Sequence, residues 1–265
     1  MIITKRLTQY DALEIKEATF RNKTFPTHFH DTYSVGIITN GIENITVNDT
    51  NYIALPKSIV IINQNELHSN EFYNEQSWTY KTLNINSDIL SYFSKSKDHF
   101  QFKNLINDEF LYHLLSGFHS TFEIQTEEKL NKIANYLIHN HLSNKELQNY
   151  NQNTEWKIIV EEIIAWMKDN IAEKINIENI AKKYHKSSFQ LIRAFRTQTG
   201  LTPIAYLLLL RLNNAKTELI EGNSLTQTAL SCGFFDQSHF NNYFKRYFGI
   251  TPKSYQENCT LLINK

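Results

Sequence analysis

The chain has 265 residues, 41% of them hydrophobic and 13% aromatic, with only seven Gly and four Pro. This composition excludes a disordered or low-complexity chain, and a length prior of about 150 residues per domain favours two domains. The charge sums to zero but is uneven, because residues 174–265 carry 12 Lys and Arg against 5 Asp and Glu, leaving residues 1–173 at −7. A C-terminal part at +7 indicates a polyanionic partner. The alternative is a charged face that is merely solvated.

The two cysteines, Cys232 and Cys259, do not make a disulfide framework or a metal-knuckle spacing, so both are expected to be reduced thiols. The first ten residues lack the apolar core of a signal peptide. No apolar run approaches the ~20 residues of a membrane span. We therefore expect a cytoplasmic protein that does not use a membrane.

The first part of the chain has the pattern of short β-strands. Four β-rich runs, at 34–39, 43–47, 52–55 and 58–62, are separated by Asn40-Gly41, Asn48-Asp49 and Pro56-Lys57. Asn-Gly between such runs is a strong hairpin signal, so a hairpin is predicted at Asn40-Gly41. Strands at this spacing predict a sandwich or small barrel over about residues 15–85.

His28 and His30 precede the first of these strands and His68 follows the fourth, and the segment that carries them resembles the cupin-like sensor domain of AraC/XylS-family regulators. The matching residues are His28, His30, Asp31, Tyr33, Gly36, Gly41, Pro56, Asn63, Glu66, His68, Trp78, Tyr80 and Lys81. Metal-binding cupins add a Glu shortly after the paired His, but here that slot holds Tyr33, Ser34 and Val35. Three imidazoles still suffice for a divalent ion. The resemblance more often implies an effector pocket, for which the candidates are His28, His30, Tyr33 and His68. A sensor fold that binds nothing is the third alternative.

Residues 88–145 change to helical spacing. Apolar residues recur every three or four positions at Leu105, Phe110, Leu111, Leu114, Leu115 and Phe118, and again at Leu130, Ile133, Leu137 and Ile138. Two amphipathic helices are predicted, packed on their own barrel or, as the family resemblance implies, building a homodimer interface. Ser143–Asn153 is polar and is the best linker candidate, which predicts a sensor and dimerisation domain over 1–150 and a second domain over 151–265.

A twelve-residue pattern occurs twice near the C-terminus, 49 positions apart. The first copy contains Phe195, Arg196, Gly200, Thr202, Pro203 and Tyr206, and the second contains Phe244, Lys245, Gly249, Thr251, Pro252 and Tyr255. Chance recurrence is implausible because Gly and Pro are scarce residues. Each copy closes a predicted helix-turn-helix unit, over about 177–199 and 225–248. A single helix over 204–220, opened by Pro203 and ended by Gly222, is predicted to join them.

The second helix of each unit is predicted to have a buried and an outward face. In the first unit Ser187 caps the helix, Leu191 and Phe195 face the core, and the outward stripe is Phe189, Ile192, Arg193 and Arg196. In the second unit Asp236 is the cap, Phe240 and Phe244 face inward, and the stripe is Ser238, Asn241, Asn242 and Lys245. Apolar side chains beside Arg suit a major-groove reader, because thymine methyls are apolar and guanine accepts a bidentate Arg.

Residues Ile177–Tyr255 closely resemble the AraC/XylS DNA-binding domain, through Arg193, Phe195, Gly200, Pro203, Tyr206, Leu207, Arg211, Leu212 and Ala215, then Ala229, Gly233, Phe234, Asp236–Phe240 and the second copy of the pattern. The resemblance implies base contacts from Phe189, Gln190, Ile192 and Arg193, and from Gln237, Ser238, His239, Asn241 and Asn242. Phosphate contacts are expected from Ser187, Arg196, Lys245 and Arg246. Arg211 and Tyr206 are expected to be structural.

Two residues depart from the family pattern. His185 stands where the first turn often has Gly, and Asn242 stands where the second helix often has Arg. Asn and Gln pair well with adenine, so the second half-site is predicted to be rich in A·T.

Together these features predict an α+β protein of two domains, with a cupin-like β-barrel and appended helices followed by an all-α domain of two helix-turn-helix units. The expected function is sequence-specific regulation of transcription, with double-stranded DNA and a small-molecule effector as partners and no cofactor. The alternatives are a metal-sensing regulator using His28, His30 and His68, a DNA binder whose first domain only dimerises, and a cupin-type metal-dependent enzyme tethered to DNA. No nucleophile–base arrangement or phosphate-binding Gly loop supports catalysis, so we expect no enzyme.

Overall fold

In a computed structural model, the described part of the chain covers residues 2–7, 13–71, 73, 77–94, 100–120, 126–143 and 154–260. The chain divides into two compact units. The first unit contains Met1–Lys145 together with Arg246–Ile250 and Ser254–Lys265, and the second contains Glu146–Lys245 with Thr251–Lys253. Apart from Ser143, the predicted linker lies outside the described residues.

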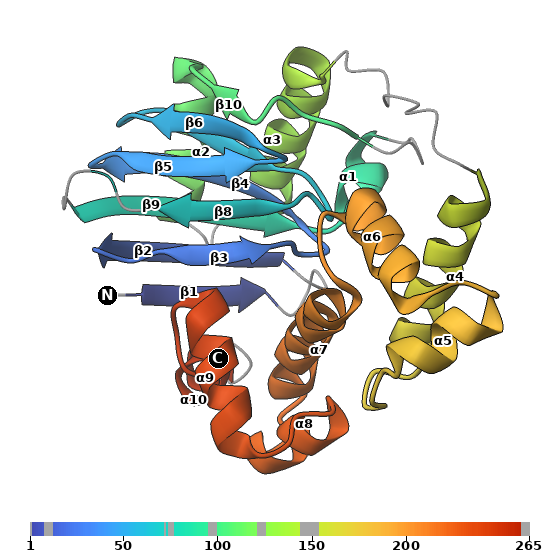
Figure 1. Cartoon of the computed structure of the whole chain (residues 1–265). Coiled ribbons are helices and arrows are strands. Elements are labelled where there is room, and N and C mark those ends of the chain that lie inside the picture. Colours follow the sequence, from blue (N-terminus) through green and yellow to red (C-terminus); the bar gives the residue numbers. More distant parts are fainter. Residues whose placement is uncertain are drawn as a thin grey trace. The chain divides into compact units, whose positions relative to one another are not determined.

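The strands of the first unit form two antiparallel sheets (Figure 1). The larger sheet has the order β1-β2-β9-β4-β7-β10, with bounds Ile2–Leu7, Leu13–Arg21, Ser77–Ile85, Tyr33–Asn40, Ile59–Ile62 and Leu105–Ile106. The smaller sheet has the order β3-β8-β5-β6, with bounds Phe25–His28, His68–Glu71, Glu43–Val47 and Thr50–Ala54. The predicted α+β fold with an N-terminal sheet domain is therefore confirmed.

The predicted hairpin at Asn40-Gly41 is wrong. Strands β4 and β5 on either side of it belong to different sheets, because β4 pairs with β7 and β9 whereas β5 pairs with β6 and β8. Gly41 has a positive φ of 74°, and a Cβ there would lie 2.1 Å from the Ser77 carbonyl oxygen. The glycine thus lets the chain pass close to β9 as it crosses between sheets. The two-residue hairpin loop is Asn48-Asp49, where Val47 pairs with Thr50 and both loop residues have positive φ.

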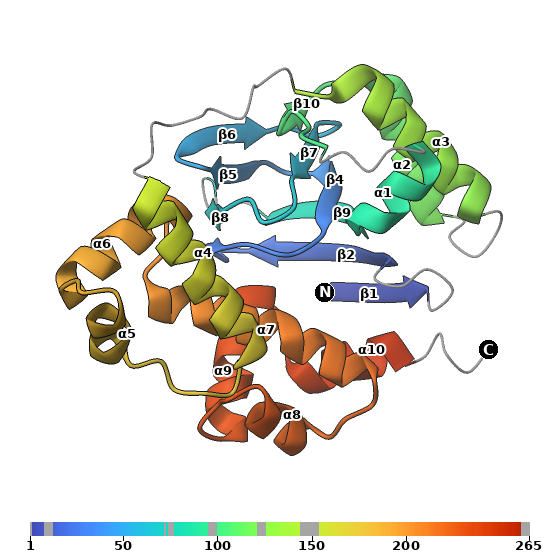
Figure 2. The same cartoon turned by 90° about the vertical axis from the view of Figure 1, so that its right-hand side faces the viewer.

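Helices cover one face of the larger sheet (Figure 2). They are α1 (Ser87–Ser94), α2 (Glu109–Ser120) and α3 (Thr126–His141). Leu111, Leu115 and Phe118 of α2 are fully buried, as predicted. Leu105 instead lies in β10, and Phe110 is 57% exposed, so the predicted stripe of the first helix begins too early.

The second unit is helical. Its elements are α4 (Thr154–Asp169), α5 (Ile177–Lys183), α6 (Ser188–Thr199), α7 (Pro203–Ile220) and α8 (Leu225–Ser231), followed by α9 (Gln237–Phe248) and α10 (Pro252–Thr260), both of which span the two units. Pro203 occupies the first turn of α7, as predicted, and Thr202 caps the helix. At 18 residues α7 is about 27 Å long. None of the described helices has the length and apolarity to cross a membrane.

One side chain joins α7 to the connection between α4 and α5. The Arg211 guanidinium donates to the carbonyl oxygens of Ile171 and Glu173, each at 2.8 Å. Beside it, Gly233 has a φ of +75°, and a Cβ there would lie 2.7 Å from Cα and O of Ala172. The turn of the second helix-turn-helix unit therefore packs against the segment that leads into the first. Arg211 is structural, as expected.

We expect Gly233→Ala to destabilise the second unit by about 2–4 kcal/mol, because it adds a clash with backbone atoms to the strain of positive φ. Gly222→Ala is the matched control, since Gly222 also has positive φ but faces open space, and it should cost only about 1 kcal/mol. Chemical denaturation followed by Trp156 and Trp166 fluorescence, in a Trp78→Phe background, measures both. Equal losses would contradict the close approach at Ala172.

Candidate functional site

The first helix-turn-helix unit is capped at both helices. The Asn176 side chain accepts from the Asn179 N–H at the start of α5. Ser187 and Gln190 form a capping box at the start of α6, where each side chain accepts from the other residue's backbone N–H. Between the helices His185 has a φ of +54°, so it adopts the left-handed conformation for which the family pattern has Gly. These caps fix where α6 begins and which face it turns outward.

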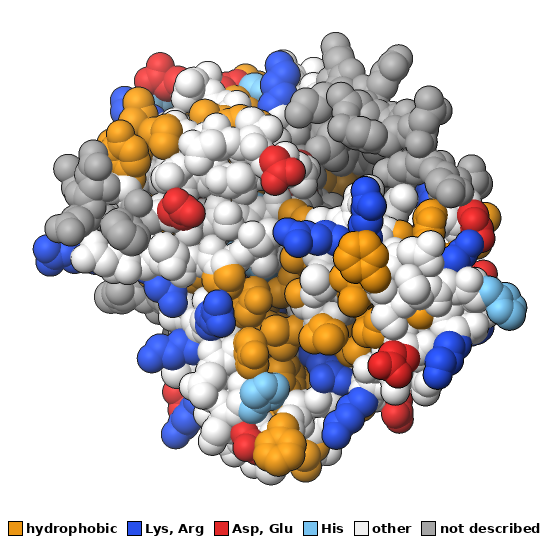
Figure 3. Space-filling view, viewed as in Figure 1, with side chains coloured by type: hydrophobic (Ala, Val, Ile, Leu, Met, Phe, Trp, Pro, Cys, Tyr) orange, Lys and Arg blue, Asp and Glu red, His pale blue; other side chains and the backbone are white. Residues whose placement is uncertain are grey.

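Helix α6 has the two faces that the sequence predicts. Leu191 and Phe195 are fully buried, whereas Phe189 is 74% exposed and Ile192 is 37% exposed. Arg193 and Arg196 are exposed, and neither guanidinium is hydrogen-bonded or ion-paired to any residue that the structure describes. Over α6, Figure 3 shows basic and hydrophobic side chains next to each other. This face presents two available guanidinium groups beside apolar surface.

The second helix-turn-helix unit repeats this construction, with a turn one residue longer. Ser224 caps α8, and Asp236 Oδ1 accepts from the His239 N–H at 2.7 Å at the start of α9. Phe240 and Phe244 are fully buried. The segment between the helices has five residues, against four in the first unit. Both α6 and α9 thus bury aromatic side chains on their inner faces, and each begins at a polar capping residue.

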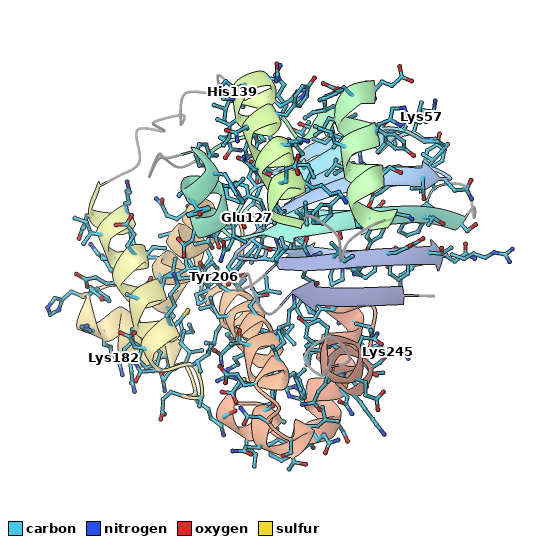
Figure 4. All side chains as sticks on the ribbon, turned by 180° about the vertical axis from the view of Figure 1, so that it is seen from behind. Lys57, Glu127, His139, Lys182, Tyr206 and Lys245 are labelled. Atoms are coloured by element: carbon cyan, nitrogen blue, oxygen red, sulfur yellow. The ribbon has the colours of Figure 1, made fainter. Side chains whose placement is uncertain are left out.

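The outward face of α9 differs from that of α6. Ser238, Asn242, Lys245 and Arg246 are exposed, and Figure 4 marks Lys245 on this helix. Asn241 is partly buried, and its Oδ1 is buried without a hydrogen-bond partner. This face therefore offers amide, ammonium and guanidinium groups, without the exposed Phe and Ile of α6.

Several predicted contact residues already have local partners. Gln190 and Ser187 hold each other in the capping box, and Gln237 accepts from the Thr226 hydroxyl at 2.9 Å. The His239 ring packs edge-on against Tyr243 at 4.8 Å. A role in binding for these residues requires exchanging or sharing those interactions, whereas Arg193, Asn242 and Lys245 are available directly.

In the first compact unit, which contains the two sheets, the three predicted histidines lie close together. The ring centroids of His28 and His68 are 4.1 Å apart, and those of His30 and His68 are 4.9 Å apart. Each Nδ1 lies 2.8–3.1 Å from a backbone carbonyl oxygen, so each Nδ1 carries the proton. Burial lowers the pKa of His68 to about 4, and burial beside the other two rings lowers that of His28 well below its usual value. His28 and His68 are therefore neutral at pH 7.

Tyr33 does not join this group. It lies in the core between the larger sheet and the helices, where its hydroxyl donates to the Phe100 carbonyl oxygen at 2.9 Å. Glu66 is held by Asn63 and Asn104, whose side-chain amides donate to Oε2 at 3.0 and 2.7 Å. Within the described residues, no group of three or more His, Cys, Asp or Glu side chains is placed to hold a metal ion.

A second buried polar cluster was missed by the sequence reasoning. Glu14 and Lys16 of β2, Tyr80 of β9, and Glu43 and Asn70 of the smaller sheet lie between the two sheets. Asn70 Nδ2 donates to Glu43 Oε1 at 2.5 Å. Glu14 accepts from Asn84 Nδ2 and, within the same unit, from the Tyr255 hydroxyl at 2.8 Å. The available signal was the alternation of charged and apolar residues in 13–18, which is equally typical of a solvent-facing strand.

The charges in this cluster are strongly perturbed. Burial raises the pKa of Glu43 to about 7, against the effect of Asn70 and Lys16. Burial also lowers the pKa of Lys16 to about 8, against the effect of Glu14 and Glu43. Both shifts favour the neutral form of each side chain in the folded protein.

We expect Glu43 to make the first unit less stable as pH rises. Because the pKa of Glu43 is higher in the folded state than in the unfolded state, this residue stabilises the folded protein fully below about pH 4.5. Its contribution to the free energy of unfolding is lost as pH rises to about 7. The loss amounts to about 3 kcal/mol. Denaturation of Glu43→Gln, followed by Trp78 fluorescence in a Trp156→Phe, Trp166→Phe background, should lack this fall between pH 5 and 8. The Glu17→Gln control, which changes a half-exposed carboxylate paired with Lys81, should retain it, and identical profiles for the two variants would contradict the buried placement of Glu43.

Comparisons with known proteins agree with both sets of features. A family model described as an AraC-like ligand binding domain matches residues 12–137, and a helix-turn-helix domain model matches residues 180–258. The transcriptional regulator YbfI of Bacillus subtilis is 27% identical over 89% of each chain. The transcriptional activator RhaS of Escherichia fergusonii is 41% identical over 36% of this chain and 34% of its own.

Solved structures show the same fold. The crystal structure of ToxT from Vibrio cholerae, with an unsaturated fatty acid bound, has a TM-score of 0.59 at 16% identity and covers 96% of this chain and 98% of its own. The two domain matches, in the order that the sequence predicts, and the full-length regulator relatives agree with one another. The chain belongs to the AraC family of helix-turn-helix transcriptional regulators, with a ligand-binding domain followed by a DNA-binding domain.

Proposed function

We propose that this regulator binds DNA by placing α6 and α9 in successive major grooves and that an effector in the first unit controls this binding. The observation that carries the proposal is the pair of capped helices with buried aromatic inner faces and unequal outer faces. Helix α7 joins the two helix-turn-helix units. This connection suits recognition helices that enter the DNA one turn, about 34 Å, apart.

The contact residues divide by chemistry. Base contacts are assigned to Phe189, Gln190, Ile192 and Arg193 of α6 and to Gln237, Ser238, His239, Asn241 and Asn242 of α9. Arg196, Lys245, Arg246 and Ser187 are assigned to phosphates, because flexible cations and helix starts bind the backbone of any sequence. The free guanidinium of Arg193 and the exposed amide of Asn242 support this division best.

Activation, dimerisation, location and the absence of enzyme activity each have separate support. The RhaS relatives carry the name transcriptional activator, which supports activation as the mode of regulation here. A homodimer through the first unit is supported by α2 and α3, where exposed Phe110 packs beside Tyr136 at 4.8 Å. Binding to DNA supports a cytoplasmic location, and the regulator relatives support a protein that is not an enzyme. No observation in the described residues favours the metal-sensing or metal-enzyme alternatives.

Replacing Arg193 with Ala should cost about 1–3 kcal/mol of specific binding and relax preference at a single base pair, because one bidentate guanine contact is lost. Lys245→Ala is the matched comparison, and it should weaken binding to all sequences alike and reduce the salt slope by about 1. Titrations of a selected site and its single-base variants, at several salt concentrations, measure both effects. A uniform loss with Arg193→Ala would show that Arg193 binds phosphate.

The half-site under α9 should be rich in A·T, because α9 presents Asn and Gln side chains and Asn242 stands where the family often has Arg. Binding-site selection with the whole chain tests this composition. Asn242→Arg should move one position of that half-site toward G·C and leave the half-site under α6 unchanged. Selection of G·C under α9 by the unaltered chain would contradict the assignment.

A further inference from the structure

Two charged side chains between the sheets of the first unit lack an ion-pair partner. Among the described residues, Lys16 Nζ makes one hydrogen bond, a long contact of 3.5 Å to the Phe248 carbonyl oxygen. Glu43 has one partner, the neutral amide of Asn70. The two residues interact electrostatically but are too far apart to form an ion pair. When ionised, Glu43 is buried and Lys16 is partly buried, each without an ion-pair partner, and such a charge is costly unless something else compensates it.

Aromatic side chains surround the same space. The ammonium of Lys16 lies 5.6 Å from the ring centroid of Tyr80 and 5.9 Å from that of Phe20. Trp78 pairs with Phe20 across β9 and β2, so its side chain is on the same face of the sheet as Lys16. Trp78 is fully buried, yet its Nε1–H has no acceptor. A buried donor without a partner, on the same face of the sheet as an ammonium without an ion pair, indicates a missing acceptor group.

A carboxylate alone satisfies only half of this arrangement. It would pair with Lys16 and accept from Trp78, but it would leave Glu43 uncompensated and add negative charge near Glu14. An amine alone would pair with Glu43 and leave Lys16 unmatched. A molecule that carries both groups pairs with Lys16 and with ionised Glu43, and the adjoining apolar side chains Ile45, Val47 and Ile62 suit an apolar body.

We propose that the effector is a small zwitterion of the α-amino acid type, with its carboxylate on Lys16 and Trp78 and its ammonium on Glu43. This inference rests on the proposed effector-responsive function and names the chemical class of the ligand. The rings of Tyr80 and Phe20 lie next to the ammonium of Lys16. Binding of the ammonium makes Glu43 ionise, so the complex forms with loss of a proton from Glu43 below about pH 7.

Isothermal titration calorimetry on the full chain tests the ligand class with five probes. Phenylalanine and leucine carry both charges, 3-phenylpropanoate carries only the carboxylate, 2-phenylethylamine carries only the ammonium, and glucose represents a neutral polyol. The proposal expects binding of at least one zwitterion, at least tenfold more tightly than any of the other probes. Failure of both zwitterions to bind at millimolar concentration, or equal binding of a singly charged probe or of glucose, would overturn it.

Variants and proton release test the assigned contacts. Lys16→Met and Glu43→Gln should each weaken zwitterion binding at least tenfold, whereas the surface variant Glu17→Gln should not change it. Titrations at pH 6 in buffers of different ionisation enthalpy should show release of up to about one proton in the unaltered chain and none in Glu43→Gln. Retained affinity or retained proton release in Glu43→Gln would overturn the assignment, and circular dichroism shows whether each variant is folded.

DNA binding by the same samples separates this inference from the proposed function. A chain that binds its selected DNA site but not a zwitterion leaves the DNA-reading function intact and overturns only the ligand class. A chain that binds zwitterions but shows no sequence preference on DNA would refute the proposed function while retaining the site.

Discussion

The hydrogen bonds from Arg211 to the carbonyl oxygens of Ile171 and Glu173 are the constraint on which the second unit depends. They hold α7 against the segment that leads into the first helix-turn-helix unit, and Gly233 places the second turn against Ala172 at the same point. Both helix-turn-helix units are therefore linked to the short backbone segment 171–173 as well as to α7. A guanidinium suits this role because its planar donors reach two carbonyl groups at once. The outer faces can then change without disturbing the frame that orients them.

The first unit treats its buried charges in two different ways. The carboxylate of Glu66 accepts hydrogen bonds from the side-chain amides of Asn63, Asn104 and Asn48. Its hydrogen-bonding capacity is therefore satisfied within the fold. Lys16 and Glu43 lie between the sheets with one neutral hydrogen-bond partner each. Their pKa values are shifted in the directions that favour the uncharged side chains. Saturated polar groups stabilise a fold, whereas uncompensated ones mark where a ligand changes the energy of the interior most. This contrast separates the cluster that we propose binds the effector from the structural carboxylate within one domain.

The sequence predicted the DNA-reading helices well because their signals are local. Ser187 and Asp236 cap the helices, and the buried pairs Leu191/Phe195 and Phe240/Phe244 follow from helical spacing. The ligand cluster was not predicted, because alternation in a strand does not tell the interior of a two-sheet domain from solvent. Tyr33 was assigned to the effector pocket from the family resemblance, whereas it lies in the core between the larger sheet and the helices. The Asn40-Gly41 signal was also read as a hairpin, since nothing local shows that the next strand joins the other sheet.

The central claim is that two rigidly joined helices read two successive major grooves with different side chains. Hydroxyl-radical footprinting of the chain on its selected site tests it most directly. The account predicts two protected patches on one face of the duplex, about 10 base pairs apart. Arg193→Ala should weaken protection mainly in one patch and Asn242→Ala mainly in the other. A single protected patch, or equal loss from both patches with either variant, would contradict it.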